Sequence, residues 1–555
     1  MPESLPAPAE KPGHSWISRN WIYAPLLVCI LIMLPRLVSP HFGLMDDGRA
    51  LSIADGILHG KFDLSWDVVA GRARPVYWAA FAFWYLLVGG HPFWYFLGNL
   101  IVFSATTFLL IYLVNSLGGT KPQAFFTGLV FTLTTSVIEN VYTLSKAENF
   151  QVLLMLSALG LVIFAARSAR KTRVWMLLLA ATILLLVASF TKESTLLVLP
   201  IAVVWWGCSW VVKAKHASSA LFVEKASRYL IFSSLVSSLI FYLGRTSLLA
   251  SSKILGVGQS SEFFFDRSNL LNSLVRWGGW ILRDYIWLLP MALVVIVGCL
   301  VMRRTPRSGL WWLAAVWMAF WLGMYIPWHF AVEYYLLPFA AGTAILSGVL
   351  LVELLGFVRQ ASRQWKWVGT VALAVTALLL LLTQANSYTD ATIQLAQDSA
   401  NTHALEYIAA NAPERSRVMV NIQLANEYIE QMQLMLANFY HRPDLQLVIY
   451  QGEDLSVMQL QAQLTYFLLA ELQNQPKITV RMGLDEPSLQ LWNSSVFPAL
   501  STWNEVFQVS ENPHILTIDF PRLLCPIIKR GNYCSVGRSL VNFKQLHYQW
   551  SVYTP

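Results

Sequence analysis

A series of apolar stretches, each about long enough to cross a lipid bilayer, constrains this chain most. A helix needs roughly 20 apolar residues to cross the hydrocarbon core, so the series predicts a polytopic α-helical membrane protein with about eleven spans. Only 13% of the 555 residues are charged, whereas soluble proteins average about 25%. The expected spans are residues 21–39, 96–116, 122–138, 150–166, 174–190, 195–212, 229–249, 286–302, 309–327, 336–357 and 367–384.

Four short basic clusters orient these spans. An even number of expected spans separates each cluster from the next, so all four lie on one side of the membrane, which the positive-inside rule identifies as the cytoplasm. The formal net charge of +8 therefore has an explanation in membrane topology, and we expect no nucleic-acid partner. The clusters are Arg167, Arg170, Lys171 and Arg173; Lys213, Lys215, Lys225 and Arg228; Arg303, Arg304 and Arg307; and Arg359, Arg363 and Lys366.

One apolar segment, Pro75–Gly90, does not fit this count as a full crossing. It is short, begins with proline and ends in two glycines, so we interpret it as a juxtamembrane or re-entrant helix on the outer side. The alternative is a full crossing with a later span miscounted, and the total could then reach 13 spans.

The chain is expected to divide into a membrane part and an outer domain. Beyond the last span the composition changes, and Glu427–Tyr440 has the pattern of an amphipathic helix while Leu445–Tyr450 has that of a strand. The expected parts are a cytoplasmic segment 1–20, a transmembrane domain 21–387 with a first outer loop 40–95, and a soluble α/β domain 388–555.

Two cysteines in the outer domain, Cys525 and Cys534, bracket a turn-rich sequence. In an oxidising compartment they could form a disulfide, and two free thiols are the alternative.

An acidic pair, Asp46 and Asp47, follows the first span directly. Carboxylates so close to hydrocarbon are costly to desolvate and persist where they bind cations or move protons. The alternative is a structural role at a helix start, where aspartate is favoured.

Other polar residues at span ends gather on the same outer side. Basic residues there oppose the positive-inside trend, and a bound phosphate is the simplest reason for them; interfacial snorkelling and structural ion pairs are the alternatives. These residues are Arg49, Arg72, Arg74, Lys146, Glu148, Lys192, Glu193, His329, Glu333, Tyr334 and Tyr335.

The order of these motifs resembles a known family. An acidic pair, then RARPVYW, KAEN, TKES and finally EYYLLP is similar to the family C integral-membrane glycosyltransferases (GT-C fold), in particular the protein O-mannosyltransferase and aminoarabinose-transferase branch. The resemblance covers roughly residues 21–385. It implies transfer, with inversion, of a sugar from a polyprenyl-phosphate donor at the periplasmic or lumenal face.

The sequence departs from that family at two places. Glu333 stands where many relatives have arginine. Some relatives carry tetratricopeptide repeats after their membrane spans, whereas residues 388–555 show no such period and no obvious family counterpart.

The chemistry of the residues fits such a reaction. Asp46 or Asp47 is the expected general base, and either carboxylate could hold a divalent cation; no cofactor is certain. Arg74 and Lys192 are expected to bind the donor phosphate, with Arg72 and Lys146 secondary. Supporting roles are expected for Glu148, Glu193, His329, Glu333 and Tyr335.

Three rival functions remain: a secondary transporter or flippase of lipid-linked substrates, a non-catalytic scaffold, and another outer-leaflet lipid-phosphate transferase or ligase. The transporter predicts ionisable residues at mid-bilayer depth and related halves. For the glycosyltransferase we expect a protein, lipid or glycan acceptor, contact with membrane lipids, and location in a bacterial inner membrane.

Overall fold

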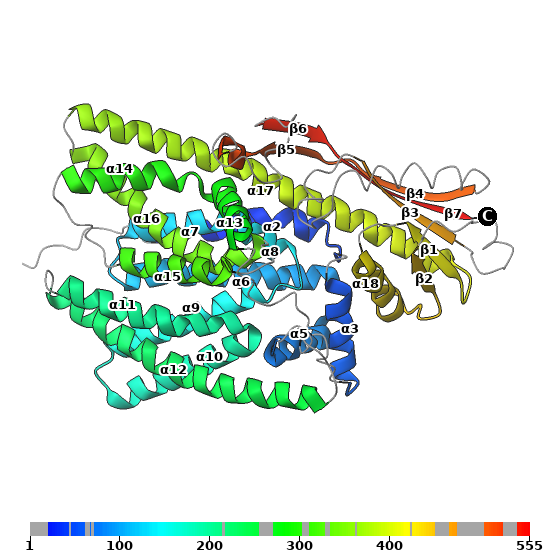
Figure 1. Cartoon of the computed structure of the whole chain (residues 1–555), viewed down its shortest axis with the longest axis horizontal. Coiled ribbons are helices and arrows are strands. Elements are labelled where there is room, and N and C mark those ends of the chain that lie inside the picture. Colours follow the sequence, from blue (N-terminus) through cyan, green and yellow to red (C-terminus); the bar gives the residue numbers. More distant parts are fainter. Residues whose placement is uncertain are drawn as a thin grey trace, which may run out of the picture.

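The computed structural model describes residues 20–43, 46–61, 67, 72–213, 217–254, 270–301, 310–327, 333–360, 363–421, 425–449, 466–473, 504–524 and 541–554. Helices form most of it (Figure 1).

Where the structure describes them, the eleven expected spans fall on helix. Among the described residues, seven helices are long and apolar enough to cross a membrane singly, and two helix pairs bent by 55° and 83° raise the number to nine if each pair is one span. The other two expected spans, 195–212 and 309–327, lie on shorter apolar helices. The predicted polytopic helical class is therefore confirmed. The membrane helices are η1 (Trp21–Tyr23), α2 (Pro25–Val38), α6 (Pro92–Ser116), α7 (Lys121–Thr132), α8 (Thr135–Tyr142), α9 (Ala147–Arg167), α10 (Lys171–Thr191), η2 (Glu193–Leu197), α11 (Val198–Lys213), α12 (Ala217–Ile254), α13 (Leu270–Tyr285), α14 (Leu288–Val301), α15 (Leu310–Tyr325), η5 (Glu333–Leu336), α16 (Leu337–Gln360) and α17 (Arg363–Asn411).

Polar side chains satisfy the main chain where the two bent pairs break. At the α7–α8 break, the Gln384 side-chain amide donates to the Leu133 carbonyl at 2.7 Å. At the α13–α14 break, the Trp287 indole donates to the Asp284 carbonyl at 2.8 Å. Such partners are required because a broken helix in a bilayer has no water to bond its freed carbonyls.

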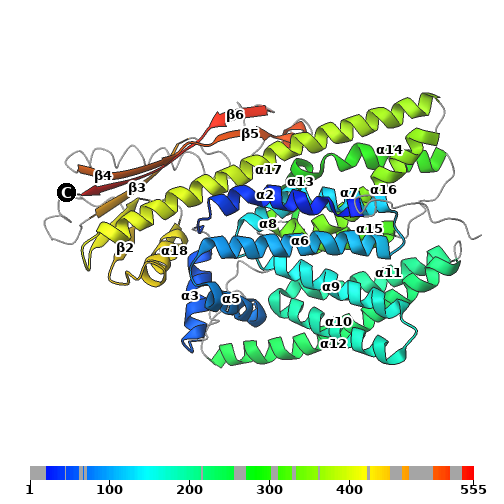
Figure 2. The same ribbon diagram turned by 180° about the vertical axis from the view of Figure 1, so that it is seen from behind.

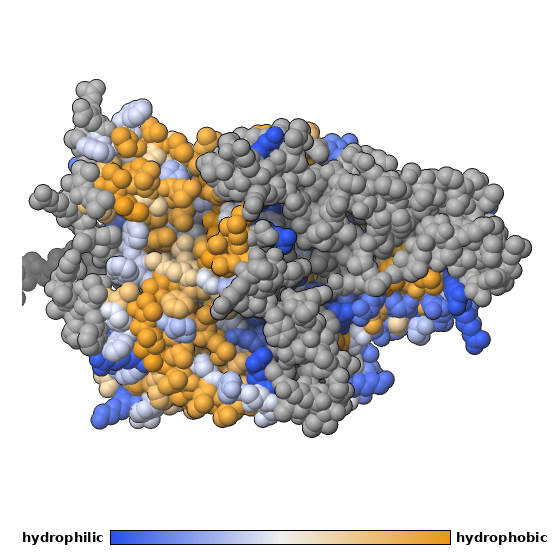
Figure 3. Space-filling model, viewed as in Figure 1, coloured by the Kyte–Doolittle hydropathy of each residue, from blue (hydrophilic) through white to orange (hydrophobic). Residues whose placement is uncertain are grey.

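Apolar side chains cover the outside of the bundle. Figure 3 shows them gathered over the part that the spanning helices occupy. Leu179 on α10 and Leu239 on α12 are among the exposed ones. This belt is the surface expected to face lipid.

The two ends of the bundle differ. The α9–α10 connection lies at one end of the bundle, as do the end of α11, the start of α12, the end of α16 and the start of α17. The C-terminal strands extend from the other end (Figures 1 and 2). The third basic cluster, at 303–307, lies outside the described residues. We call the strand-bearing end the outer end, after the orientation that the sequence predicts.

Two short helices form the outer end of the membrane part. Helix α3 (Asp47–Leu58) runs across the direction of the spanning helices, and α5 (Pro75–Val88) packs against it (Figure 1). Proline at the first position starts α5, and Gly89, with a φ of 62°, ends it. Helix α5 coincides with the short segment that we interpret as juxtamembrane.

The C-terminal region is the predicted α/β domain. Five of its described strands form a sheet of order β2-β1-β3-β7-β4, with β1 parallel to β2 and β3 and with β7 antiparallel to β3 and β4. The predicted helix and strand are confirmed as α18 (Ala425–Asn438) and β2 (Gln446–Ile449). The remaining elements are β1 (Arg417–Asn421), β3 (Tyr466–Gln473), β4 (Asn504–Glu511), β5 (His514–Ile518), η7 (Phe520–Leu524), β6 (Val541–Gln545) and β7 (His547–Thr554).

Helix α17 joins the two domains without a break. It passes the expected boundary at 387/388 and packs against β4, β5 and β7. Its side chains bond the strands: Asn386 donates to the Ile518 carbonyl at 3.0 Å, and Asn401 accepts from the Trp550 indole at 2.6 Å. The outer domain is thus held by the last membrane helix itself.

A glycine-mediated helix contact gives a test of this packing. A Cβ at Gly348 on α16 would lie 2.5 Å from the Gln123 carbonyl oxygen and would also clash with Thr127 on α7. Gly348→Ala should therefore lower stability by about 1–3 kcal/mol in a thermal-unfolding measurement. Gly356→Ala, on the same helix, is the control, because a Cβ there meets nothing within 4 Å among the described residues. Equal melting of the two variants would contradict the packing.

Candidate functional site at the outer end

Asp46 begins α3 in a conformation that is rare for a residue with a side chain. Its φ is 65°, in the left-handed region, and its side chain makes no capping hydrogen bond. The helix-cap alternative therefore does not describe this carboxylate. Its side chain stays 27% exposed, with one oxygen 3.8 Å from the Lys146 ammonium. A strained, partly exposed carboxylate beside a cation is typical of a functional position.

Asp47 faces the other way, into the protein. It is 1% exposed, and the Gly43 N–H donates to its Oδ2 at 2.8 Å. Within the described residues its Oδ1 has no hydrogen-bond partner. Burial, with the nearby negative charge of Asp398, raises the pKa of Asp47 to about 7.

A buried ion pair lies next to Asp47. Arg36 of α2 bonds Asp398 of α17, and both side chains are almost fully buried. A Cβ at Gly43 would lie 3.2 Å from Asp398 Oδ1 and 3.4 Å from Asp47 Oδ2, so glycine lets the chain pass close to both carboxylates. Sequence analysis missed Arg36 and Asp398; an arginine within an apolar span was the available signal.

The outer domain also contacts the start of α3. The Gln431 side chain of α18 accepts from the Arg49 N–H at 2.6 Å, and Glu430 pairs with the Arg49 guanidinium at 2.7 Å. A Cβ at Gly48 would lie 2.6 Å from the Gln431 carbonyl oxygen. The acidic pair is therefore positioned by both domains.

Two lysines, from separate loops, approach a pair of tyrosine rings. The Lys146 ammonium lies 4.0 Å from the centre of the Tyr334 ring, and the Lys192 ammonium lies 4.2 Å from that of Tyr335. Lys192 also forms an ion pair with the buried Glu148. These contacts bring together Lys146, Glu148, Lys192 and Tyr335, four of the residues that the sequence analysis assigns to the outer side.

Arg74 is already paired. Its guanidinium bonds Asp67, which also accepts from the Trp78 indole at 2.5 Å. Sequence analysis missed Asp67. Its position, as an acidic residue shortly before the basic RARP motif, was the available signal. The Glu193 side chain accepts from the Ala73 N–H at 2.7 Å, which holds the Arg74 loop against the turn after α10.

Arg72 belongs to the same loop. Its backbone N–H donates to the Asp67 carbonyl at 2.7 Å.

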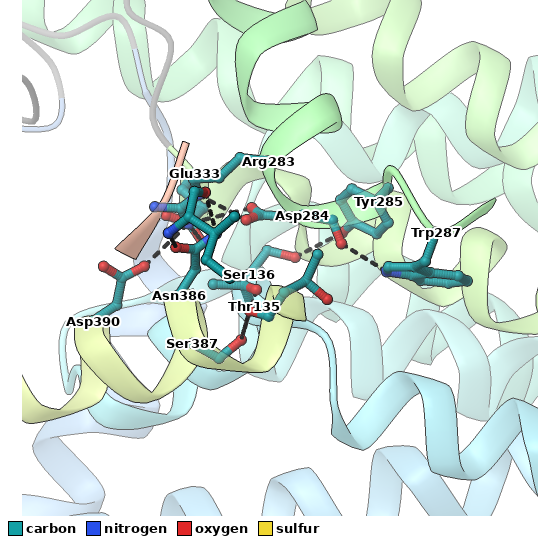
Figure 4. A network of polar contacts seen from close by, with 12 residues as sticks. Thr135, Ser136, Arg283, Asp284, Tyr285, Trp287, Glu333, Asn386, Ser387 and Asp390 are labelled. Atoms are coloured by element: carbon teal, nitrogen blue, oxygen red, sulfur yellow. Dashed lines mark hydrogen bonds and ion pairs between the residues drawn. The ribbon is translucent and has the colours of Figure 1, made fainter. Parts of the chain in front are cut away.

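Glu333 belongs to a second charged network (Figure 4). The Arg283 guanidinium forms an ion pair with Glu333, and it also pairs with Asp284 at 2.7 Å and with Asp390 at 3.1 Å. Glu333 thus anchors η5, whose next two residues are the lysine-facing tyrosines. Arg283 was missed, although an Arg-Asp pair within an apolar region is a signal for a buried ion pair.

Three predicted residues cannot be placed. His329, Cys525 and Cys534 lie outside the described residues. Among the residues that are described, no group of three or more His, Cys, Asp or Glu side chains is arranged to hold a metal ion. A divalent cation at the acidic pair stays a prediction from the sequence.

The raised pKa of Asp47 gives a stability test. A folded-state pKa of about 7, above the ordinary 3.8, means that the folded protein holds this proton more tightly than the unfolded chain. Stability therefore falls as pH rises from about 4 to about 7. Between pH 6 and pH 8 the wild-type protein should lose about 1 kcal/mol relative to Asp47→Asn, measured by thermal unfolding. Identical pH dependence of the two proteins would show that Asp47 titrates normally.

Comparison with known proteins gives structural similarity alone. No family model and no curated protein matches the sequence. The chain is similar to the oligosaccharyltransferase of Archaeoglobus fulgidus tethered with an acceptor peptide, at 10% identity and a TM-score of 0.48, over 89% of this chain and 73% of that one. It is also similar to ArnT from Cupriavidus metallidurans bound to undecaprenyl phosphate, at 14% identity and a TM-score of 0.47, over 96% and 98% of the two chains.

Proposed function

We propose that this protein is a membrane glycosyltransferase that moves a sugar from a polyprenyl-phosphate donor to an acceptor hydroxyl at the outer face, with Asp46 as general base. The observation that carries the proposal is the meeting of Asp46, Lys146 and Lys192 at the tyrosine pair. A base and two cations at the bilayer edge suit a reaction in which a hydroxyl loses a proton and a lipid phosphate leaves. The order of the sequence motifs supports the same chemistry.

Asp46 is the better base of the pair because it is accessible. A general base must reach the proton that it removes, and Asp46 is 27% exposed on the side of the lysines. Asp47 is 1% exposed and faces Asp398 and Arg36. We assign Asp47 to holding the turn that presents Asp46.

The two lysines suit the leaving phosphate. Each ammonium has three N–H donors. Lys146 has the Asp46 carboxylate and the Tyr334 ring beside it. Lys192 has the Glu148 carboxylate and the Tyr335 ring beside it. Donors remain for phosphate oxygens, and the interaction strengthens as negative charge develops on them. Asp67 neutralises the Arg74 guanidinium, so we assign Arg74 to holding its loop. The direct contact with the leaving phosphate is assigned to Lys192, because Lys146 contacts the proposed base Asp46.

The reaction follows from this arrangement. Asp46 takes the proton of the acceptor hydroxyl, whose oxygen forms a bond to the anomeric carbon. The bond between that carbon and the phosphate oxygen breaks, and its electron pair stays with the phosphate beside Lys192. Attack from the face opposite the phosphate inverts the anomeric configuration.

The location of the site favours transfer over transport. The buried charged residues described above gather at the outer end of the bundle, whereas a transporter requires ionisable groups near mid-bilayer depth. The basic connections at the opposite end support a cytoplasmic orientation for that end. A periplasmic site in a bacterial inner membrane follows as part of the proposal.

Asparagine substitutions of the acidic pair test the base. In proteoliposomes supplied with undecaprenyl phosphates carrying a labelled hexose or pentose, Asp46→Asn should lower kcat about 10²–10⁴-fold, because the acceptor proton has no base. Asp47→Asn is the matched control and should keep at least about a tenth of the activity. Full activity of Asp46→Asn, or an equal loss in Asp47→Asn, would contradict the assignment.

Paired glutamine substitutions test the phosphate site. The double variant Lys192→Gln/Glu148→Gln removes the ammonium without leaving a lone buried charge, and it should bind undecaprenyl phosphate at least about tenfold more weakly. Glu148→Gln alone keeps the ammonium and should bind the lipid as tightly as the wild type or more tightly. Unchanged binding by the double variant would exclude Lys192 from this role.

A further inference from the structure

Tyr77 lies between the two turns that carry the proposed catalytic groups. It is in the first turn of α5 and is 6% exposed. Its ring belongs to a small cluster with Trp78, Ala50 of α3 and Ala147, the residue between Lys146 and Glu148. The side chain thus reaches the region where the turn of Asp46 and the turn of Lys146 meet.

The Tyr77 hydroxyl has no hydrogen-bond partner within the described part of the chain. A buried tyrosine hydroxyl normally has one, and leaving it unpaired is unfavourable. Tyr95 and Tyr142 follow the rule, donating to the Gly89 carbonyl at 3.0 Å and to the Ile32 carbonyl at 2.6 Å. Among the described residues the hydroxyls of Tyr325 and Tyr440 also have no partner, but only Tyr77 lies between the turns of Asp46 and Lys146. An unpaired polar group in a candidate active site indicates a place that a substrate atom fills.

Several charged groups act on the Tyr77 phenol. The Arg74 guanidinium lies 5.7 Å from the centre of the Tyr77 ring, and the carboxylates of Asp46, Glu148 and Asp47 act on the phenol electrostatically. Burial, reinforced by those carboxylates, raises its pKa well above the usual range. The phenol therefore keeps its proton and can both donate and accept a hydrogen bond.

The cations of the site discriminate between the parts of the donor. A phosphate is attracted to the ammonium groups beside Tyr334 and Tyr335, whereas Arg74, the cation beside the Tyr77 ring, is already paired with Asp67. A sugar hydroxyl is neutral, and it both donates and accepts. It therefore matches a phenol that has carboxylates as neighbours.

We propose that the Tyr77 hydroxyl forms a hydrogen bond with a hydroxyl of the sugar being transferred, so that Tyr77 recognises the sugar and not the lipid phosphate. This inference rests on the proposed function and adds a substrate contact to it.

Binding of two kinds of lipid to Tyr77→Phe tests the contact. The probes are bare undecaprenyl phosphate and the same lipid phosphate esterified to glucose or to ribose, measured at equilibrium in nanodiscs. The wild type should bind one of the sugar-bearing lipids more tightly than the bare lipid. Tyr77→Phe should weaken that binding about tenfold, the effect of one lost hydrogen bond, and should leave binding of the bare lipid unchanged.

Three binding results would overturn the inference: equal weakening for both kinds of lipid, no change for either, or a wild type that does not prefer a sugar-bearing lipid. Thermal unfolding adds a further check, because Tyr77→Phe removes a hydroxyl without a partner and should melt no lower than the wild type. A melting temperature several degrees lower would show that the hydroxyl has a structural partner, and would also overturn it.

Tyr95→Phe is the matched control, because its hydroxyl bonds the main chain. It should melt lower than the wild type and keep the preference for the sugar-bearing lipid.

The transfer assay separates this inference from the proposed function. If Asp46→Asn retains full transfer while Tyr77→Phe loses the sugar preference, the base assignment fails and the sugar contact stands. If Asp46→Asn loses transfer and Tyr77→Phe binds both lipids as the wild type does, the sugar contact alone fails.

Discussion

The pairing of buried charges at the outer end of the bundle is the constraint on which the rest of the structure depends. Arg36 and Asp398 are buried in contact with each other, and removing one partner of such a pair costs about 3–5 kcal/mol because the other charge is left uncompensated. The pair joins the first membrane helix to the last. It therefore holds the end of α2 against α17, and the acidic pair Asp46 and Asp47 follows directly after that end.

Helix α17 transmits that constraint to the rest of the site. Its Asp398 lies beside Asp47, and its Asp390 joins the Arg283 network that anchors η5 and the lysine-facing tyrosines. The same helix bonds β5 and β7 of the outer domain. The proposed base, the proposed phosphate site and the outer domain are thus attached to one rigid element.

The sequence predicted the helical membrane class and the α/β outer domain because apolar length and periodicity are local properties of the chain. It also indicated Lys146, Lys192 and the acidic pair, since charges at span ends are visible without a structure. It did not identify Asp67, Arg283 or Asp398 as partners, because their ion pairs join segments that only the fold brings together. Nor did it separate Asp46 from Asp47, which differ in burial and direction and not in residue type.

The most direct test of the account follows the fate of the donor lipid. Purified protein in vesicles is incubated with sugar-bearing undecaprenyl phosphate and membrane acceptors, and the lipids and the sugar linkage are then analysed by mass spectrometry and NMR. The account predicts release of bare undecaprenyl phosphate and a new glycosidic bond of inverted anomeric configuration. An intact donor that has only moved to the other leaflet would contradict it and would identify the protein as a flippase.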